Sequence, residues 1–230
     1  HHAHLEAYFA IPCAGFVLHT LNLRLHADDI AYIAGHAGDR VLIVDDVLLP
    51  LYEKIRAQAK FEHVIVVPLT GAPVAAGYAD YERFIAAASP LAPPVIDERD
   101  AAGMCYTSGT TGRPKGVVYS HRALVLHSMA SAMGDTLALT QADALCPVVP
   151  MFDVNAWGLP FTGAMVGCKL VMPGPHLDAV SLLDLYAGEG VTFTAGVPTI
   201  WMGILNAIEK EPARWKLTQG MRMVVGGAAA

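Results

Sequence analysis

The chain has 230 residues, of which 54% are hydrophobic and 16% charged, a composition typical of folded proteins rather than of disordered ones. Its formal net charge of −6 argues against a broad surface for nucleic acid or anionic lipid. The sequence contains neither the run of about eighteen apolar residues that a membrane span needs nor a basic start followed by an apolar segment. We therefore expect no membrane span and no signal peptide.

The cysteines lack the Cys-x-x-Cys spacing of metal and redox motifs, so we expect reduced thiols and a cytoplasmic protein. They are Cys13, Cys105, Cys146 and Cys168. Three early histidines, His1, His2 and His4, have no cluster of cysteines or carboxylates beside them, and the start of a helix explains them better than a metal site does. The sequence thus predicts no metal site.

The first predicted elements form a strand–helix–strand unit that follows an amphipathic helix. The helices have apolar residues every three or four positions, and the strands are continuous runs rich in β-branched residues, as in strands buried on both faces. The expected elements are a helix at 28–37 that Gly38 ends, a strand at 41–44, a helix at 48–59 and a strand at 64–67. Such a unit pairs its strands in parallel.

Prolines at 90, 93 and 94 mark a connection, because proline suits neither a regular helix nor a central strand. We expect a first subdomain at 1–88, this connection at 89–99 and a second subdomain at 100–230. Beyond the connection, strands at 103–107 and 117–120 form a hairpin-like tongue, and Ser120 can cap a helix that begins at His121.

Strands and helices alternate through the rest of the chain, which predicts an α/β fold of layered, mostly parallel sheets with flanking helices. The expected strands are 144–149, 169–172, 191–194 and 221–225, and the expected helices are 156–166, 179–187 and 198–208.

The tongue carries Tyr106-Thr-Ser-Gly-Thr-Thr-Gly-Arg-Pro-Lys-Gly116, a run of glycines, hydroxyls and one lysine that suits a phosphate-binding loop. Glycine lets backbone N–H groups approach an anion, and the hydroxyls and the ammonium add donors. The run is not a Walker loop, because Gly116 and not Ser or Thr follows Lys115, and the chain has no Gly-x-Gly-x-x-Gly after a predicted strand. The alternative is a solvated turn between two strands.

The segment from Ser108 to Gly116 resembles the signature of the adenylate-forming superfamily of acyl-CoA synthetases, luciferases and peptide-synthetase adenylation domains. Further segments resemble its medium- and long-chain fatty acyl-CoA synthetases, namely 4–13, 18–25, 149–158 and 224–228. The resemblance implies the central piece of a synthetase's large N-terminal domain, with two incomplete subdomains. It also implies that the partners are a small carboxylic acid, ATP and coenzyme A, with Mg²⁺ as a cofactor.

The same resemblance implies roles for individual residues. Catalysis is expected from Thr111 and Lys115. The phosphate clamp would comprise Thr107, Ser108, Gly109, Thr110, Thr111, Gly112, Lys115 and Gly116. The acid would contact Phe152, Asp153, Trp157, Gly226, Gly227 and Ala228. For Phe152 and Trp157, ordinary core packing is the alternative.

Two departures from the family pattern affect these expectations. Asp153 stands where the family commonly has His, which adds negative charge near an acid and a phosphate; alternatively, Asp153 caps the helix near Asn155. The chain also has no match to the family's magnesium glutamate, its ribose aspartate, its hinge or its C-terminal domain with a catalytic lysine. We therefore expect the chain alone to fail at complete ligation.

Two other function classes stay open. One is a binding module that retains affinity for nucleotide or acid without turnover and self-associates into a homo-oligomer. The other is an ATP-independent hydrolase that uses Ser108 or Ser120 near His121, although the chain has no Gly-x-Ser-x-Gly elbow.

Overall fold

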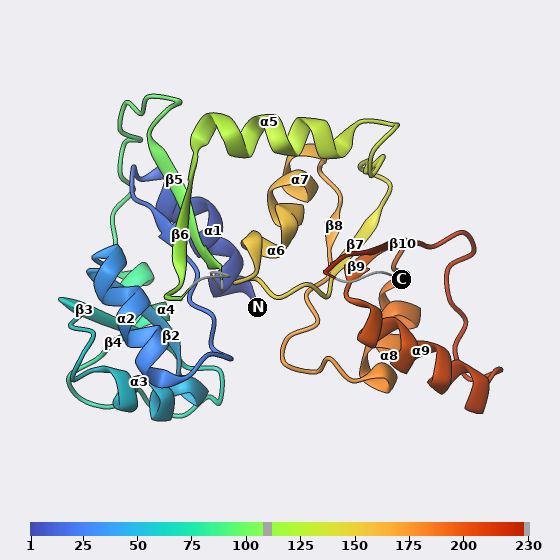
Figure 1. Ribbon diagram of the computed structural model, residues 1–230, viewed down its shortest axis with the longest axis horizontal. Coiled ribbons are helices and arrows are strands. Elements are labelled where there is room, and N and C mark those ends of the chain that lie inside the picture. Colours follow the sequence, from blue (N-terminus) through green and yellow to red (C-terminus); the bar gives the residue numbers. More distant parts are fainter. Residues whose placement is uncertain (108–111, 228–230) are drawn as a thin grey trace. The chain divides into compact units, whose positions relative to one another are not determined.

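The computed structural model describes residues 1–107 and 112–227, shown in Figure 1. Its contacts divide the chain into two compact units, residues 2–121 and residues 122–230. The predicted boundary at 89–99 falls inside the first unit and stays a prediction. In the described part of the chain, no helix combines the length and apolarity needed to cross a bilayer.

The first unit alternates short strands and helices. In chain order it contains α1 (His2–Cys13), β1 (Leu18–His19), α2 (Ala27–Ala37), β2 (Val41–Asp45), a 3-10 turn (Asp46–Leu48), α3 (Leu49–Ile55), β3 (His63–Val67), β4 (Ala79–Asp80), α4 (Tyr81–Ala86), β5 (Ala101–Thr107) and β6 (Lys115–Ser120). Helix α2 ends as predicted at Gly38, whose φ of 76° is left-handed and whose N–H bonds the carbonyl of Ala34.

Strands β2, β3 and β4 form a parallel sheet in that order. Val44 of β2 lies opposite Val66 of β3, and both are buried. This pairing confirms the parallel strand–helix–strand unit. Buried residues of α2 and α3 pack together beside it, among them Ile30, Ala34 and Ile55.

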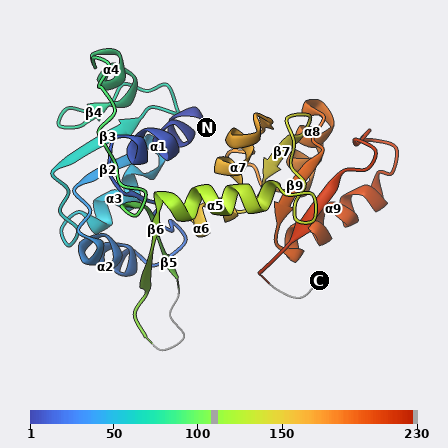
Figure 2. The same cartoon turned by 90° about the horizontal axis from the view of Figure 1, so that it is seen from above.

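The predicted hairpin is also confirmed. Strand β5 pairs antiparallel with β6, from Ala101 opposite Ser120 to Thr107 opposite Lys115, and β1 adds in parallel on the other side of β5. Figure 2 shows β5 and β6 as an extended ribbon.

The second unit is built on one parallel sheet of order β10-β9-β7-β8. Its elements are α5 (His121–Ala132), β7 (Ala144–Pro147), α6 (Val154–Trp157), α7 (Leu159–Val166), β8 (Lys169–Leu170), α8 (Ala179–Glu189), β9 (Phe193–Gly196), α9 (Pro198–Lys210) and β10 (Arg222–Val225). Helices α8 and α9 pack against the strands through Leu182, Tyr186 and Ile204. Together with the first unit, this sheet confirms the mixed α/β class with mostly parallel strands.

The helix predicted at 156–166 begins later than expected. Val154, Asn155, Ala156 and Trp157 have φ between 47° and 54°, so α6 is one left-handed turn. The right-handed helix α7 starts only after Gly158, and its Pro160 fits the first turn, where no N–H is needed.

Candidate functional site

The phosphate hairpin has a described stem and a tip outside the described residues. Thr107 and Lys115 lie opposite each other at the end of the ladder, and both are exposed. Gly112 has a φ of 135°, a conformation that side chains disfavour. Of the predicted clamp, Ser108, Gly109, Thr110 and Thr111 lie outside the described residues, as does Ala228.

An aromatic residue fixes the stem of the hairpin. A Cβ at Gly116 would lie 3.0 Å from the ring of Tyr106, so the glycine allows the ring to cover the opposite strand. The hydroxyl of Tyr106 lies 2.6 Å from Nδ1 of His36 on α2. Burial, together with the charge of Asp39, raises the pKa of Tyr106, which favours the neutral hydroxyl. Helix α2 thus anchors the strand that enters the loop.

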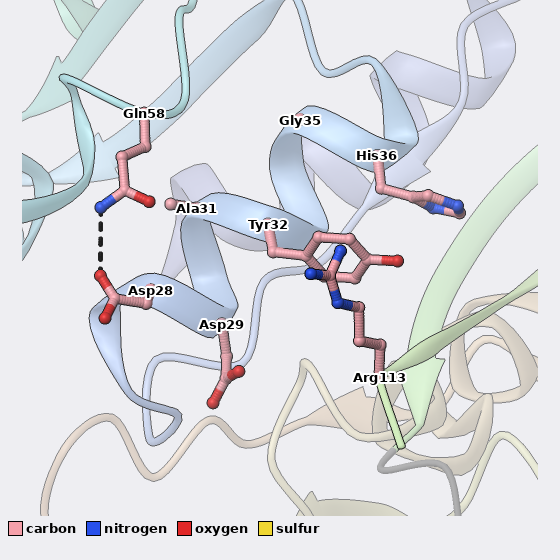
Figure 3. Close-up of a pocket in the computed structure, with 8 residues that line it drawn as sticks. All are labelled: Asp28, Asp29, Ala31, Tyr32, Gly35, His36, Gln58 and Arg113. Atoms are coloured by element: carbon pink, nitrogen blue, oxygen red, sulfur yellow. Dashed lines mark hydrogen bonds between the residues drawn. The ribbon is translucent and has the colours of Figure 1, made fainter. Parts of the chain in front are cut away.

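Arg113, in the phosphate signature, also reaches α2. Its guanidinium lies 4.8 Å from the centre of the Tyr32 ring, and Figure 3 shows the two stacked at the edge of a polar pocket of about 560 Å³. Asp28 and Asp29 line the same pocket, and Asp28 accepts a hydrogen bond of 3.1 Å from Gln58. Two carboxylates would repel a phosphate, so this pocket is a poor phosphate site.

The second unit contains an apolar cavity of about 380 Å³. It is lined by His127, Ala130, Ser131, Thr136, Leu137, Trp157, Leu159, Phe193, Ala195 and Val224. The strand register places Val224 of β10 opposite Ala195 of β9, and these two residues form part of the wall. Apolar walls with a few polar groups suit a ligand with a hydrocarbon part.

Trp157 connects two segments that the sequence predicts to contact the acid. A Cβ at Gly226 would lie 2.5 Å from Cη2 of Trp157, closer than any side chain can approach. The indole therefore lies directly against the backbone that follows β10. Gly227 is also constrained, with a φ of 85° and a would-be Cβ 3.3 Å from Val197.

Trp157, which contacts Gly226, is the last residue of the left-handed turn α6. Gly158, with a φ of 69°, completes the turn, and a Cβ there would lie 2.8 Å from the ring of His127. Positive φ at four consecutive non-glycine residues costs energy, and such strain gathers at functional sites. Asn155 and Ala156 are buried within the turn.

The other predicted acid contacts lie at the rim of this turn. Phe152 is half-buried and does not line the cavity. Asp153 is exposed, and its side chain makes no capping hydrogen bond to α6, which is not a right-handed helix. The helix-cap alternative for Asp153 is therefore wrong.

Sequence reasoning did not single out several residues that line the cavity. His127, Ala130 and Ser131 are spaced by three and four along α5, so helical periodicity places them on one face. Phe193 and Leu137 carried no such signal, because an apolar residue in a strand or connection fits any core.

The described residues, 1–107 and 112–227, include no cluster of three His, Cys, Asp or Glu side chains that could hold a metal ion.

Residues 1–230 match the protein family described as AMP-binding enzyme. The long-chain-fatty-acid–CoA ligase of Thermus thermophilus is 54% identical over 100% of this chain and 41% of its own length. The medium-chain-fatty-acid–CoA ligase of Ectopseudomonas oleovorans is 46% identical over 98% of this chain and 42% of its own length. Among solved structures, the inhibitor-bound N-terminal domain of FACL13 from Mycobacterium tuberculosis has a TM-score of 0.72 and 31% identity, covering 93% of this chain and 51% of that one.

The chain spans about two-fifths of the length of the curated relatives that it matches. The match to the family nevertheless extends over every residue of the chain. The chain therefore belongs to the AMP-binding enzymes, the adenylate-forming family that includes the acyl-CoA ligases.

Proposed function

We propose that this chain supplies the phosphate hairpin and part of the acyl pocket of an ATP-dependent, AMP-forming acyl-CoA synthetase. The proposed substrate is a fatty acid or a similarly apolar carboxylic acid. The observation that carries the proposal is the apolar cavity beside Trp157, whose ring lies against Gly226 at the carboxyl end of β10. Ligands of parallel α/β sheets bind at the carboxyl ends of the strands.

In the proposed reaction, the carboxylate attacks the α-phosphorus of ATP and pyrophosphate leaves; the thiol of coenzyme A then displaces AMP from the acyl-adenylate. Charge develops on the phosphates, so a fixed cation and fixed donors lower the barrier. Lys115 supplies the ammonium at the stem of the hairpin, opposite Thr107. Thr111 is proposed as the second catalytic residue, and Gly112 and Gly116 let the backbone approach the phosphates. We assign no step to Mg²⁺ on these residues.

The acid would enter beside the left-handed turn. Trp157 and Val224 would contact the hydrocarbon part, and the backbone at Gly226 and Gly227 would lie beside the carboxylate end. Asp153, exposed at the rim, would place a negative charge near that end. This charge would oppose the binding of an anionic substrate.

The ATP-independent hydrolase stays an alternative for which the sequence offers no Gly-x-Ser-x-Gly elbow. A binding module without turnover stays compatible with the same cavity. Self-association and a cytoplasmic location stay predictions.

Calorimetric titration of the 230-residue chain with octanoate tests the acyl pocket. We expect octanoate to bind, and Gly226→Ala to weaken binding at least tenfold because the new Cβ displaces Trp157. Gly203→Ala is the matched control, since its Cβ would lie at an ordinary 3.7 Å from Ala179. Absence of octanoate binding to the folded wild-type chain would overturn the proposal.

A second experiment separates a synthetase part from a complete enzyme. Mass spectrometry of the chain with octanoate, ATP and coenzyme A should detect no acyl-CoA, because several charge-stabilising groups have no match in this sequence. Loss of even one such group lowers turnover by a factor on the order of 10² to 10³. ATP-dependent acyl-CoA that Lys115→Ala abolishes would contradict this expectation.

A further inference from the structure

The apolar cavity is lined by Val224 of strand β10 and by Trp157. Successive side chains of a strand point to opposite faces of the sheet. Arg222, Val224 and Gly226 are therefore on the same face. The partners of Arg222 and Val224 across the ladder are Phe193 and Ala195 on β9, the neighbouring strand in Figure 1. Arg222 and Gly226 are four positions apart, a length of about 13 Å in extended chain.

Arg222 contacts two residues that line the cavity, although it lies outside the lining itself. Its Nη1 donates to the carbonyl oxygens of Leu137 and Ala138 at 2.6 and 3.0 Å. The guanidinium also lies 5.1 Å from the centre of the Phe193 ring. Leu137 and Phe193 both line the cavity, whereas Arg222 itself does not.

Asp143 fixes the direction of the guanidinium. Its Oδ1 accepts from Nη2 of Arg222 at 2.6 Å and from Oγ1 of Thr192 at 2.8 Å, and its Oδ2 accepts from the N–H of Thr140 at 2.8 Å. The Asp143 side chain is only 10% exposed. A carboxylate with this many donors has one orientation, and so does the arginine bound to it.

The part of the cavity wall that Arg222 contacts by hydrogen bonds belongs to the connection between α5 and β7. Ala138 has a φ of 50°, and the hydroxyl of Thr136 lies 2.5 to 3.0 Å from the carbonyls of Ala130, Ser131 and Met133. The single proton of this hydroxyl is shared among these carbonyls and holds the connection to the end of α5. Leu137 and Leu139 pack against the sheet, and Arg222 adds hydrogen bonds from β10 to the same connection.

We infer that Arg222 is a positioning residue for acyl-chain length: through Leu137 and Phe193 it closes the deep end of the acyl pocket and limits the chain that the pocket accepts. This inference rests on the proposed function. The planar fork of arginine can hold two carbonyls and a carboxylate at once, which the single ammonium of lysine cannot do in the same geometry.

The test is the ratio of the dissociation constants for octanoate and dodecanoate, measured by calorimetry on the 230-residue chain. Arg222→Met should release Leu137, open the deep end and shift this ratio toward dodecanoate by roughly tenfold, the effect of burying about two further methylene groups. Arg222→Lys should shift it in the same direction by less. A purely structural role would weaken both acids equally and leave the ratio unchanged.

The matched control is Arg214→Met. Arg214 also lies over an aromatic ring, Trp215 at 4.6 Å, and also pairs with carboxylates, but it is remote from the cavity lining. For Arg214→Met, the ratio of the dissociation constants for octanoate and dodecanoate should equal that of the wild type. Leu137→Ala enlarges the deep end without touching the ion pair, and it should shift the ratio toward dodecanoate even if Arg222→Met does not fold.

Two failures are distinguishable. If the wild-type chain binds both acids and neither Arg222→Met nor Arg222→Lys changes the ratio of the dissociation constants, the inference is wrong and the acyl pocket stands. If the folded wild-type chain binds neither acid, the proposed function fails, and the inference fails with it.

Discussion

The Tyr106 hydroxyl lies 2.6 Å from Nδ1 of His36, so one hydrogen bond joins the strand entering the phosphate hairpin to helix α2. Tyr106→Phe should lower the free energy of unfolding by about 0.5–1.5 kcal/mol, the usual net value of one neutral hydrogen bond. Urea denaturation measures this change. In a double-mutant cycle with His36→Ala, the two changes should be less than additive; full additivity would show that the contact contributes nothing.

Lys115 is the exposed cation at the stem of the hairpin. Lys115→Ala should weaken binding of ATP or pyrophosphate by about 1.5–3 kcal/mol, because a hydrogen bond to a charged group is lost. Calorimetric titration measures this loss. Lys60→Ala, at another exposed lysine of the same unit, is the control and should leave the affinity unchanged. Equal affinities of Lys115→Ala and the wild type would contradict the phosphate clamp.

Asp153 is exposed beside the left-handed turn and makes no capping bond there. In a protein that joins this chain to the family's remaining segments, Asp153→His should raise the initial rate of acyl-adenylate formation, because it removes a negative charge near the proposed position of the substrate carboxylate. Asp153→Asn removes the charge without adding an imidazole and separates the two effects. Equal rates in all three forms would make Asp153 a bystander.

Asp143 makes stability depend on pH. Burial raises the pKa of its carboxyl, but hydrogen bonds from Arg222, Thr140 and Thr192 outweigh burial and hold the pKa below its ordinary value. A carboxyl group whose pKa is lower in the folded than in the unfolded state stabilises the fold at a pH above the unfolded pKa of about 3.9. This stabilisation is lost as the pH falls through the pKa of the folded state. Asp143→Asn should therefore cost about 1.5–3 kcal/mol at neutral pH, and the difference from the wild type should shrink below about pH 4. Unfolding free energies at pH 7 and pH 3 measure it; a difference that is independent of pH would show that the carboxylate charge does not matter.

Val154 is β-branched, exposed and left-handed, with a φ of 47°. Asparagine tolerates this conformation far better, so Val154→Asn should raise the free energy of unfolding by about 1 kcal/mol. Val125→Asn replaces an exposed valine in the regular helix α5 and should give no gain. Thermal unfolding compares the two variants. A loss of stability in Val154→Asn would mean that the turn is not strained.

Sequence reasoning predicted the elements that local chemistry specifies. Gly38 ends α2, and the β-branched runs that became β2 and β3 pair in parallel. The left-handed turn was not predicted, because Val154 and Ala156 individually favour other conformations, and the contact of Trp157 with Gly226 joins residues far apart in sequence.

The residues that line the cavity could not be predicted for a different reason. An apolar pattern predicts that Leu137 and Phe193 are buried, but not which neighbours bury them. The order β10-β9-β7-β8 decides that, and it depends on contacts between residues far apart in sequence.

The position of β9 between β7 and β10 has a consequence for biosynthesis. The N-terminal part of a nascent chain leaves the ribosome first, so β9 can pair with β7 while Arg222–Val225 are still inside the exit tunnel. During that interval one side of β9 presents unpaired N–H and C=O groups, a template for intermolecular strand addition. Nascent chains stalled with β9 outside the exit tunnel and Arg222–Val225 still inside it should therefore aggregate or recruit chaperones, and emergence of β10 should end this exposure.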